Sequence, residues 1–414
     1  MLRLFFALAQ ILFFTACIKN DFSSIPGYSA SNLDNTIAVD TAYRRYFEGV
    51  YHLSLGDDLF GQQLVAKWAN GYLCFFGENN GRFINLQMGY NPDDSSFRMA
   101  GFWHDPFLAR QGQVQFTLTK ADGAEAVFAH TGNNITLRGY LENDPGRPLV
   151  LTFARPFSAA VLSRSFTIAA HRGGGRNSDN IPYAENSLNL VRHVEQFGAT
   201  GIEIDIRLTR DKVPIVYHDP DINTRLTLKS PLVGDIHQFD AGFLRAYIRL
   251  VDGQFIPTLD EMLKMVIDST TVADVWLDCK DGGEDRFFEH VVPVLKKALS
   301  YAKARGRKVS MLIGLPTEDA YTKFIAFPGH TGIPSLCEIS LAKAKAAGSV
   351  VFAPRWTLGI LEAETNDAHA NNIRVVTWTL DDPDGMEAVI TQSQYDGALT
   401  NYPSMLAYHF YSQE

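Results

Sequence analysis

From about residue 165 onward, short β-rich runs alternate with helical patterns, and this alternation limits the possible folds more than any other feature. Alternating β and α units specify a parallel sheet with right-handed crossovers, and eight such units that close on themselves form a TIM barrel. An open doubly wound sheet is the alternative, but Gly173-Gly174-Gly175 lacks the spacing of its dinucleotide fingerprint. We therefore predict an α/β TIM (β/α)8 barrel over residues 161–414. The strand candidates are residues 167–173, 201–208, 274–281, 308–314, 335–340, 350–354, 374–380 and 395–403.

One part of this region departs from the β/α alternation. After the run 201–208, the turn residues Arg210-Asp211-Lys212 lead directly into a second β-rich run that ends at Asp219, which predicts a hairpin. About forty residues then separate this run from Pro257. A long insertion of this kind usually serves function, so we expect it, including residues 231–247, to lie over the barrel mouth and shape substrate access.

Residues 38–160 show a different pattern, with many short β-rich runs and no alternating helices. Turn sequences such as Asn70-Gly71 and Asp144-Pro145-Gly146 separate the runs. Regular spacing of this kind predicts an all-β antiparallel accessory domain, either a sandwich or a small barrel. The sequence does not decide whether this domain binds a glycan or lipid headgroup, shields the active site or spaces it from a membrane.

Residues 1–17 have the features of an export signal. Arg3 precedes an apolar run over residues 4–14 that is too short to span a bilayer and fits a signal peptide. The run leads into Ala16-Cys17, which resembles a bacterial lipoprotein cleavage box. We expect Cys17 to be the lipidation site, residues 18–37 to be a flexible tether, and the protein to be exported and lipid-anchored at the bacterial outer membrane or in the periplasm. The alternative is an ordinary signal peptide with an incidental cysteine.

Composition excludes some functions. The chain of 414 residues carries a formal net charge of −9, whereas binding of nucleic acid requires concentrated Lys and Arg, so we expect no nucleic-acid partner. Cys74, Cys279 and Cys337 lie far apart with no paired spacing, which indicates buried thiols and neither a zinc knuckle nor a disulfide framework. Protein partners cannot be inferred from the sequence.

Acidic side chains gather on the predicted strands. Glu203 and Asp205 project to the same face of one strand because side chains alternate, and two neighbouring buried carboxylates repel each other unless a cation or a shared proton compensates. Asp278 and Lys280 end the next barrel strand with the same spacing. Carboxyl ends of barrel strands meet at one face, and three convergent carboxylates favour a hard cation, Mg²⁺ or Ca²⁺, over zinc. The alternative for Asp278 and Lys280 is a plain ion pair.

The motifs between residues 171 and 219 resemble the signature of the glycerophosphodiester phosphodiesterase family. They are His171-Arg172-Gly173, Ala184-Glu185-Asn186-Ser187, Glu203-Ile204-Asp205 and His218-Asp219. The similarity covers about residues 165–410. It implies a TIM barrel that hydrolyses glycerophosphodiesters to an alcohol and glycerol 3-phosphate with a divalent metal. Two positions depart from the family pattern: Asp278 stands where the family usually has Glu, and Asn401 stands where it usually has Asp.

The resemblance implies a role for each candidate site residue. Glu203, Asp205 and Asp278 would hold the metal, and His171 and His218 would share the acid and base roles in an order that the sequence leaves open. Arg172 and Lys280 would bind the phosphate oxygens. Two further residues have alternatives. Glu185 would ligate the metal or hydrogen-bond a neighbouring site residue, or else only favour a helix N-terminus; Trp378 would pack against the glycerol moiety, or else belong to the barrel core.

Two other functions remain open at this stage. The first is a phosphodiesterase acting on another lipid headgroup, similar to phosphoinositides or sphingolipids. The second is a non-catalytic, lipid-anchored binding protein that keeps the pocket without turnover. The presence of both histidines, the two cationic residues and all three carboxylates favours an enzyme.

Overall fold

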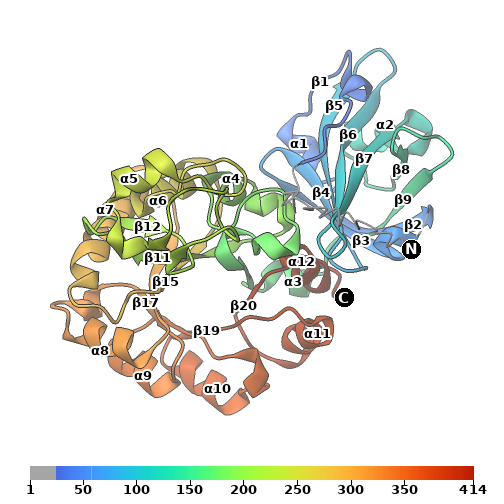
Figure 1. Ribbon diagram of the computed structural model, residues 1–414. Coiled ribbons are helices and arrows are strands. Elements are labelled where there is room, and N and C mark those ends of the chain that lie inside the picture. Colours follow the sequence, from blue (N-terminus) through green and yellow to red (C-terminus); the bar gives the residue numbers. More distant parts are fainter. Residues whose placement is uncertain (1–24, 57) are drawn as a thin grey trace, which may run out of the picture.

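The fold is given by a computed structural model that describes residues 25–56 and 58–414, and it consists of two β-barrels joined side by side (Figure 1). The predicted signal peptide, Cys17 and residues 18–24 of the predicted tether lie outside the described residues. Within the described ranges, every helix is too short or too polar to cross a membrane.

The N-terminal unit is a closed antiparallel barrel. Strands β2 to β9 pair in sequence order around the ring, β5 also pairs with β6, and β2 pairs with β9, so that the sheet closes on itself. The structure thus decides between the two predicted alternatives in favour of the small barrel. A large apolar core fills it, with Tyr51, Phe75 and Phe116 almost fully buried. The elements are β1 (Ile37–Ala38), α1 (Thr41–Arg44), β2 (Gly49–Leu55), β3 (Gln63–Ala69), β4 (Tyr72–Gly77), β5 (Phe83–Asn91), β6 (Ser96–Asp105), β7 (Arg110–Leu118), α2 (Ala124–Phe128), β8 (Thr136–Leu141) and β9 (Pro148–Arg155).

The C-terminal unit is a parallel eight-stranded barrel surrounded by helices, as the alternation predicts. Closure comes from β10, which pairs with β11 on one side and β20 on the other, and this excludes an open doubly wound sheet. The strands are β10 (Thr167–Ala170), β11 (Gly201–Leu208), β15 (Asp274–Cys279), β16 (Ser310–Leu315), β17 (Ser335–Cys337), β18 (Val351–Phe352), β19 (Arg374–Thr377) and β20 (Gly397–Thr400). The helices are α3 (Ala159–Ser163), α4 (Leu188–His193), α6 (Leu259–Ser269), α7 (Phe287–Ala304), α8 (Glu318–Ala326), α9 (Leu341–Ala347), α10 (Glu362–Ala370), α11 (Pro383–Gln392) and α12 (Pro403–Tyr411).

The predicted hairpin and insertion are both present. Strand β12 (Pro214–Val216) pairs antiparallel with the end of β11, and Lys212 in the connecting turn has a positive φ of 62°. The insertion that follows carries β13 (Asp221–Ile222), β14 (Gly234–Asp235) and α5 (Ala241–Tyr247). It has an apolar core of its own, which fixes it as a compact unit against β12. The core residues include Ile222, Leu226, Ile236, Leu244, Ile248 and Leu250.

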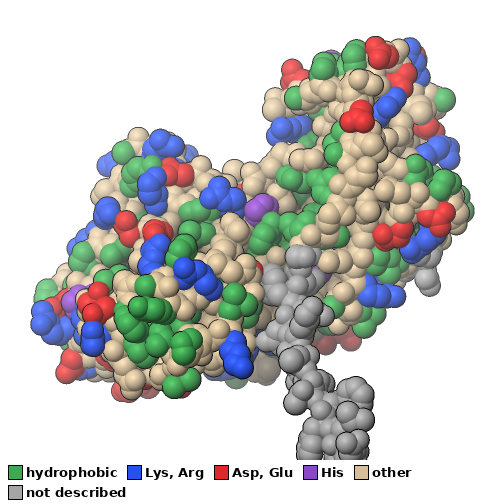
Figure 2. Space-filling model, turned by 45° about the horizontal axis from the view of Figure 1, so that its top comes forward, with side chains coloured by type: hydrophobic (Ala, Val, Ile, Leu, Met, Phe, Trp, Pro, Cys, Tyr) green, Lys and Arg blue, Asp and Glu red, His purple; other side chains and the backbone are tan. Residues whose placement is uncertain are grey.

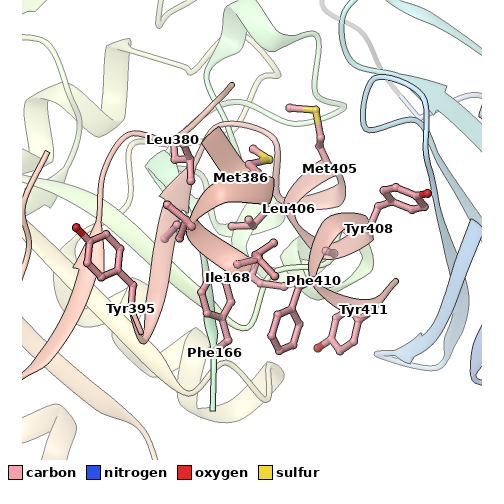
Figure 3. Packing of buried hydrophobic residues seen from close by; sticks show 14 of the residues in the cluster. Phe166, Ile168, Leu380, Met386, Tyr395, Met405, Leu406, Tyr408, Phe410 and Tyr411 are labelled. Atoms are coloured by element: carbon pink, nitrogen blue, oxygen red, sulfur yellow. The ribbon is translucent and has the colours of Figure 1, made fainter. Parts of the chain in front are cut away.

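The two barrels share a hydrophobic cluster that is centred on the last helix, α12. Met405, Leu406 and Tyr408 of α12 belong to the same cluster as Phe76 of the N-terminal barrel, and Tyr408 lies on the side of α12 that faces that barrel (Figure 3). Ser404 donates a hydrogen bond from its hydroxyl to the carbonyl oxygen of Gly81 at 2.5 Å. Figure 2 shows the molecular surface hollowed between the two lobes.

Candidate active site

Side chains of alternate strand residues fill the inside of the parallel barrel. The apolar layer consists of Ala169, Trp276, Leu312, Leu336, Val351, Ala353, Val376 and Leu399. Because strand side chains alternate, the residue two positions further along each strand also points inward, at the carboxyl end of the barrel. Those residues are His171 directly after β10, Asp278 within β15 and Asn401 directly after β20. The alternation thus gathers polar groups in one layer above the apolar core.

Three carboxylates meet in this layer. Glu203, Asp205 and Asp278 each offer one oxygen, and these oxygens all lie within 4.8 Å of one another. One oxygen of each (Oε1, Oδ1 and Oδ1, respectively) is buried and makes no hydrogen bond within the described part of the chain, although the Lys280 ammonium approaches Asp205 Oδ1 to 3.0 Å. Buried carboxylate oxygens are costly when they lack a partner. Convergent oxygens that need positive charge therefore fit a divalent cation.

The electrostatics of the cluster support this interpretation. Burial and the neighbouring charges of Asp205 and Asp278 raise the pKa of Glu203 well above its ordinary value. Although burial alone would raise the pKa of Asp205, Lys280 and the two histidines hold it below its usual range. Burial also raises the pKa of Asp278. These shifts favour the protonated form of Glu203, and a bound cation would displace that proton.

His171 stands beside the cluster with a neutral partner behind it. Its Nδ1 lies 2.7 Å from Oδ1 of Asn401, and the Asn401 side-chain nitrogen donates to Asp381. Because that contact fixes the amide, its oxygen faces His171, and the imidazole carries its proton on Nδ1. Nε2 then faces the cluster with a free lone pair, 3.7 Å from a Glu203 oxygen. Burial lowers the pKa of His171 to about 4, so the ring is neutral near pH 7.

His218 has a charged partner behind it. Its Nδ1 lies 2.7 Å from Oδ1 of Asp219, and its Nε2 accepts a hydrogen bond from Nη2 of Arg172 at 2.9 Å. Burial lowers the pKa of His218, while the charge of Asp205 and the hydrogen bond to Asp219 oppose that shift. The carboxylate behind His218 favours an imidazolium, which the amide behind His171 does not.

Arg172 is held in an unusual backbone conformation. Its φ of 52° lies in the left-handed region, which costs a non-glycine residue about 1–2 kcal/mol. Its backbone N–H donates to Glu203 Oε2 at 2.7 Å. The following Gly173 and Gly174 also have positive φ, and a Cβ on either would meet α4 at 2.7 Å or less. The loop therefore packs tightly under the helix and brings Arg172 to the barrel mouth.

Glu185 lies beside Arg172 and apart from the three clustered carboxylates. It is almost fully buried and accepts hydrogen bonds from Nη1 of Arg172 at 2.8 Å and from the backbone N–H of Asn177 at 2.8 Å. Nη1 of Arg225 also donates to both oxygens of Glu185, and Nη2 of Arg225 donates to Asp219. The geometry makes Glu185 a partner of two arginines. The next residue, Asn186, donates to Asp205 at 2.6 Å and orients that carboxylate.

Trp378 follows β19 at the barrel mouth, where it is half-buried. Its indole N–H donates to the carbonyl oxygen of Ala353 at 2.8 Å, which fixes the ring. The guanidinium of Arg355 lies over that ring, 4.2 Å from its centre, and Trp276 packs edge-on from below at 6.4 Å. The ring thus belongs partly to the barrel core and partly to the rim.

Two residues of the site, Arg225 and Asp381, were not predicted from the sequence. Both lie in loops beyond a strand end, where side-chain alternation no longer applies. The sequence did offer one indication of Arg225. Glu185 and Asp219 had no assigned cationic partner, and buried or half-buried carboxylates require one. A second acidic group, formed by His237, Asp281 and Glu284, could also surround an ion, but Asp281 is already paired with Arg207 at 2.6 Å.

Together the fold and the site define a TIM-barrel phosphodiesterase. The chain belongs to the glycerophosphoryl diester phosphodiesterase family, whose sequence model matches residues 171–405.

Known relatives and solved structures resemble the parallel barrel. A glycerophosphodiester phosphodiesterase of Caldanaerobacter subterraneus is 24% identical over 258 residues, covering 58% of this chain and 95% of the relative. A probable glycerophosphodiester phosphodiesterase 2 of Mycobacterium tuberculosis is 27% identical over 260 residues, covering 57% and 88%. A crystal structure of a glycerophosphodiester phosphodiesterase from Parabacteroides distasonis has 21% identity and a TM-score of 0.47, covering 60% of this chain and 98% of that one. An Oleispira antarctica phosphodiesterase in complex with the product sn-glycerol-3-phosphate has 18% identity and a TM-score of 0.46, covering 58% and 95%.

Proposed function

We propose that the protein hydrolyses glycerophosphodiesters to an alcohol and glycerol 3-phosphate, with a divalent cation and histidine acid/base catalysis. One observation carries this proposal: three carboxylates converge beside two imidazoles at the barrel mouth, and each has one buried oxygen that makes no hydrogen bond to the described residues. Membership of the family supports the reaction class, and the names of the curated relatives agree with it.

Glu203, Asp205 and Asp278 would hold the cation. An all-oxygen donor set favours Mg²⁺ or Ca²⁺. When bound, the cation supplies charge stabilisation for the phosphoryl oxygens. Lys280 adds a positive charge next to the same carboxylates, where Asp205 and Asp278 raise its pKa against the opposing effect of burial. It therefore stays protonated and can hold a phosphate oxygen.

The two histidines would divide the proton transfers according to their partners. His171, with a neutral amide behind it and a free Nε2, would take a proton from the attacking water or from a neighbouring substrate hydroxyl. His218, with Asp219 behind it, would carry the proton to the leaving alcohol. Nη2 of Arg172 now occupies Nε2 of His218. A phosphate would draw the guanidinium to its own non-bridging oxygens and free that nitrogen.

Glu185 and Trp378 would position other groups and would not take part in the proton transfers. Glu185 would position Arg172 for the phosphate, since both of its oxygens are already occupied by arginines. Trp378 would offer its fixed indole face to the glycerol moiety.

Turnover of glycerophosphocholine and glycerophosphoethanolamine, measured with and without a chelator, tests the proposal. We expect glycerol 3-phosphate to form, to stop forming on chelation, and to reappear when Mg²⁺ or Ca²⁺ is added back. An Asp205→Asn variant should stay inactive after the metal is restored. Turnover only of another headgroup phosphodiester would favour that substrate class, whereas binding that survives chelation with no product would favour a non-catalytic binding protein.

We also propose that the protein is exported and anchored by lipid on Cys17 at the bacterial outer membrane or in the periplasm. The short apolar run and the cleavage-box sequence support this. Mass spectrometry of the mature N-terminus checks it, with Cys17→Ser as the comparison. An acylated Cys17 that is lost in the variant would support the anchor, and an unmodified N-terminus cleaved elsewhere would contradict it.

A further inference from the structure

A fourth acidic side chain faces the barrel mouth, on the wall opposite the histidine loop. Glu338 directly follows β17, and its backbone N–H continues the ladder by donating to Leu315. Two residues earlier, Leu336 points into the apolar layer inside the barrel. By the same alternation, the Glu338 side chain points inward in the layer of the catalytic groups. In the closed ring, β17 stands directly across from β10, the strand that His171 follows.

Glu338 lies beside the carboxylate cluster but is not part of it. Burial raises the pKa of Glu338 well above its ordinary value, and the charge of Asp278 raises it further. Lys280 and Arg355 act in the opposite direction, so the carboxyl lies within electrostatic range of all three groups. Yet the group of oxygens within 4.8 Å of one another, among the residues that the structure describes, does not include Glu338.

The carboxyl of Glu338 has an unused oxygen. Its Oε1 is buried and makes no hydrogen bond within the described part of the chain. Glu185, which is also buried in this region, has both oxygens occupied by arginines. A buried carboxyl oxygen without a donor destabilises the fold, and such a group is commonly kept because a ligand supplies the donor.

The neighbours of Glu338 indicate which kind of ligand would donate a hydrogen bond to its unused oxygen. Next along the wall, Arg355 spreads over the ring of Trp378, and in the described ranges it forms no salt bridge that would occupy its N–H groups. A flat aromatic face, a carboxyl acceptor and a guanidinium donor together match a short polyol, whose C–H groups pack on the ring while its hydroxyls both donate and accept.

We propose that Glu338 is a specificity-determining residue that accepts hydrogen bonds from the free hydroxyls of the glycerol moiety, an inference that rests on the proposed function. All glycerophosphodiesters share the glycerol moiety. A buried acceptor in a fixed position can therefore hydrogen-bond the same hydroxyls in every substrate. The variable headgroup then extends toward the open side of the mouth, where the insertion lies.

Calorimetry with two phosphate monoesters tests this subsite. Glycerol 3-phosphate carries the hydroxyls, and n-propyl phosphate has the same chain length without them. With Mg²⁺ or Ca²⁺ present, the wild type should bind glycerol 3-phosphate about tenfold more tightly than propyl phosphate, the size expected for one or two hydrogen bonds. Glu338→Leu should lose this preference while keeping its affinity for propyl phosphate. Glu338→Gln, which keeps one acceptor, should retain part of the preference.

The control is Glu318→Gln, an exposed carboxylate that follows β16 and pairs with Lys343; it should keep the full preference. Because Oε1 of Glu338 has no hydrogen-bond donor among the described residues, substitution of Glu338 should not lower the melting temperature, so misfolding will not obscure the result. An unchanged preference in Glu338→Leu overturns the inference, as does a loss of cation affinity, which would make Glu338 a metal ligand. If the wild type shows the preference without hydrolysing any diester, the proposed reaction fails while the subsite stands.

Discussion

At the scale of single residues, the two histidines differ in the group behind Nδ1. His171 has the amide of Asn401 and His218 has the carboxylate of Asp219. A carboxylate stabilises an imidazolium and an amide does not, so this pair of contacts separates a base from an acid. The sequence could predict that both histidines belong to the site. It could not assign their roles, because the assignment depends on how Asp381 orients Asn401.

Removal of either imidazole should therefore lower turnover, but with different substrate dependence. His171→Ala and His218→Ala should each reduce kcat on glycerophosphocholine by about 10²–10⁴-fold. A diester with a p-nitrophenol leaving group needs no general acid, so it should restore much of the activity of His218→Ala and little of that of His171→Ala. Steady-state kinetics on both substrates measure the difference, with the exposed His52→Ala as control. Equal recovery in both variants would refute the assignment.

Exchange of the amide and carboxylate behind His171 should shift the pH dependence. In the double variant Asp381→Asn/Asn401→Asp, a carboxylate would face the ring and favour its protonated form. The pKa of His171, about 4 in the native protein, should rise by about 1–3 units. Since the base works only when neutral, the acid limb of kcat/KM should move to higher pH by a similar amount. An unmoved limb in a folded variant would show that His171 is not the base.

Binding of the cation should release protons. The raised pKa of Glu203 means that the folded, metal-free protein keeps a proton that a free glutamate loses above about pH 4.3. Between about pH 4.3 and the raised pKa of Glu203, the metal-free protein loses stability as pH rises, because the unfolded state binds fewer protons than the folded state. Cation affinity should rise with pH, and calorimetry in buffers of different ionisation enthalpy should detect the release. Glu203→Gln should bind more weakly without release, and pH-independent binding by the wild type would contradict this expectation.

At the scale of elements, β-strand alternation accounts for what the sequence could predict. Glu203, Asp205 and Asp278 lie on two paired strands, Asp205 directly opposite Asp278, so their spacing along the chain fixes their direction. Arg225 could not be predicted because it lies in a loop of the insertion, where no strand or helix periodicity fixes the direction of a side chain. Closure of the N-terminal sheet into a barrel likewise depends on distant strand pairings, and the local sequence could not choose between barrel and sandwich.

We expect the insertion to contribute to catalysis through Arg225. This side chain links Glu185 to Asp219, and so holds Arg172 and His218 in place from behind. Arg225→Ala should lower kcat/KM by about 10- to 100-fold, as for residues that orient other site groups, with cation affinity unchanged. Arg245→Ala, which removes an arginine of the same insertion that pairs with Glu261, should keep nearly full activity. A loss of cation affinity in Arg225→Ala would place its effect at the metal instead.

At the scale of the whole molecule, the two barrels are joined by a shared core. Phe75 and Phe76 are neighbours on β4 that point in opposite directions: Phe75 into the N-terminal barrel and Phe76 into the cluster shared with α12. Both side chains are almost completely buried. The accessory domain is thus a packed part of the molecule, and the periodicity of either half alone could not reveal this contact.

Truncation of these two rings should separate their roles. Each Phe→Ala change should cost about 3–5 kcal/mol. Because the shared cluster couples the barrels, the wild type should unfold in one transition. Phe76→Ala should split it into two, whereas Phe75→Ala, which leaves the shared cluster intact, should lower the temperature of a single transition. Calorimetric unfolding, followed together with activity, measures this. Two independent transitions in the wild type would disprove the coupling.

The most direct test of the catalytic centre is anomalous diffraction from crystals soaked in Mn²⁺, a cation with similar preference for oxygen ligands. We expect one strong peak bound by Glu203 Oε1, Asp205 Oδ1 and Asp278 Oδ1, at a Mn²⁺ concentration that supports turnover. A peak only at another site, or turnover with these three oxygens unliganded, would contradict the account.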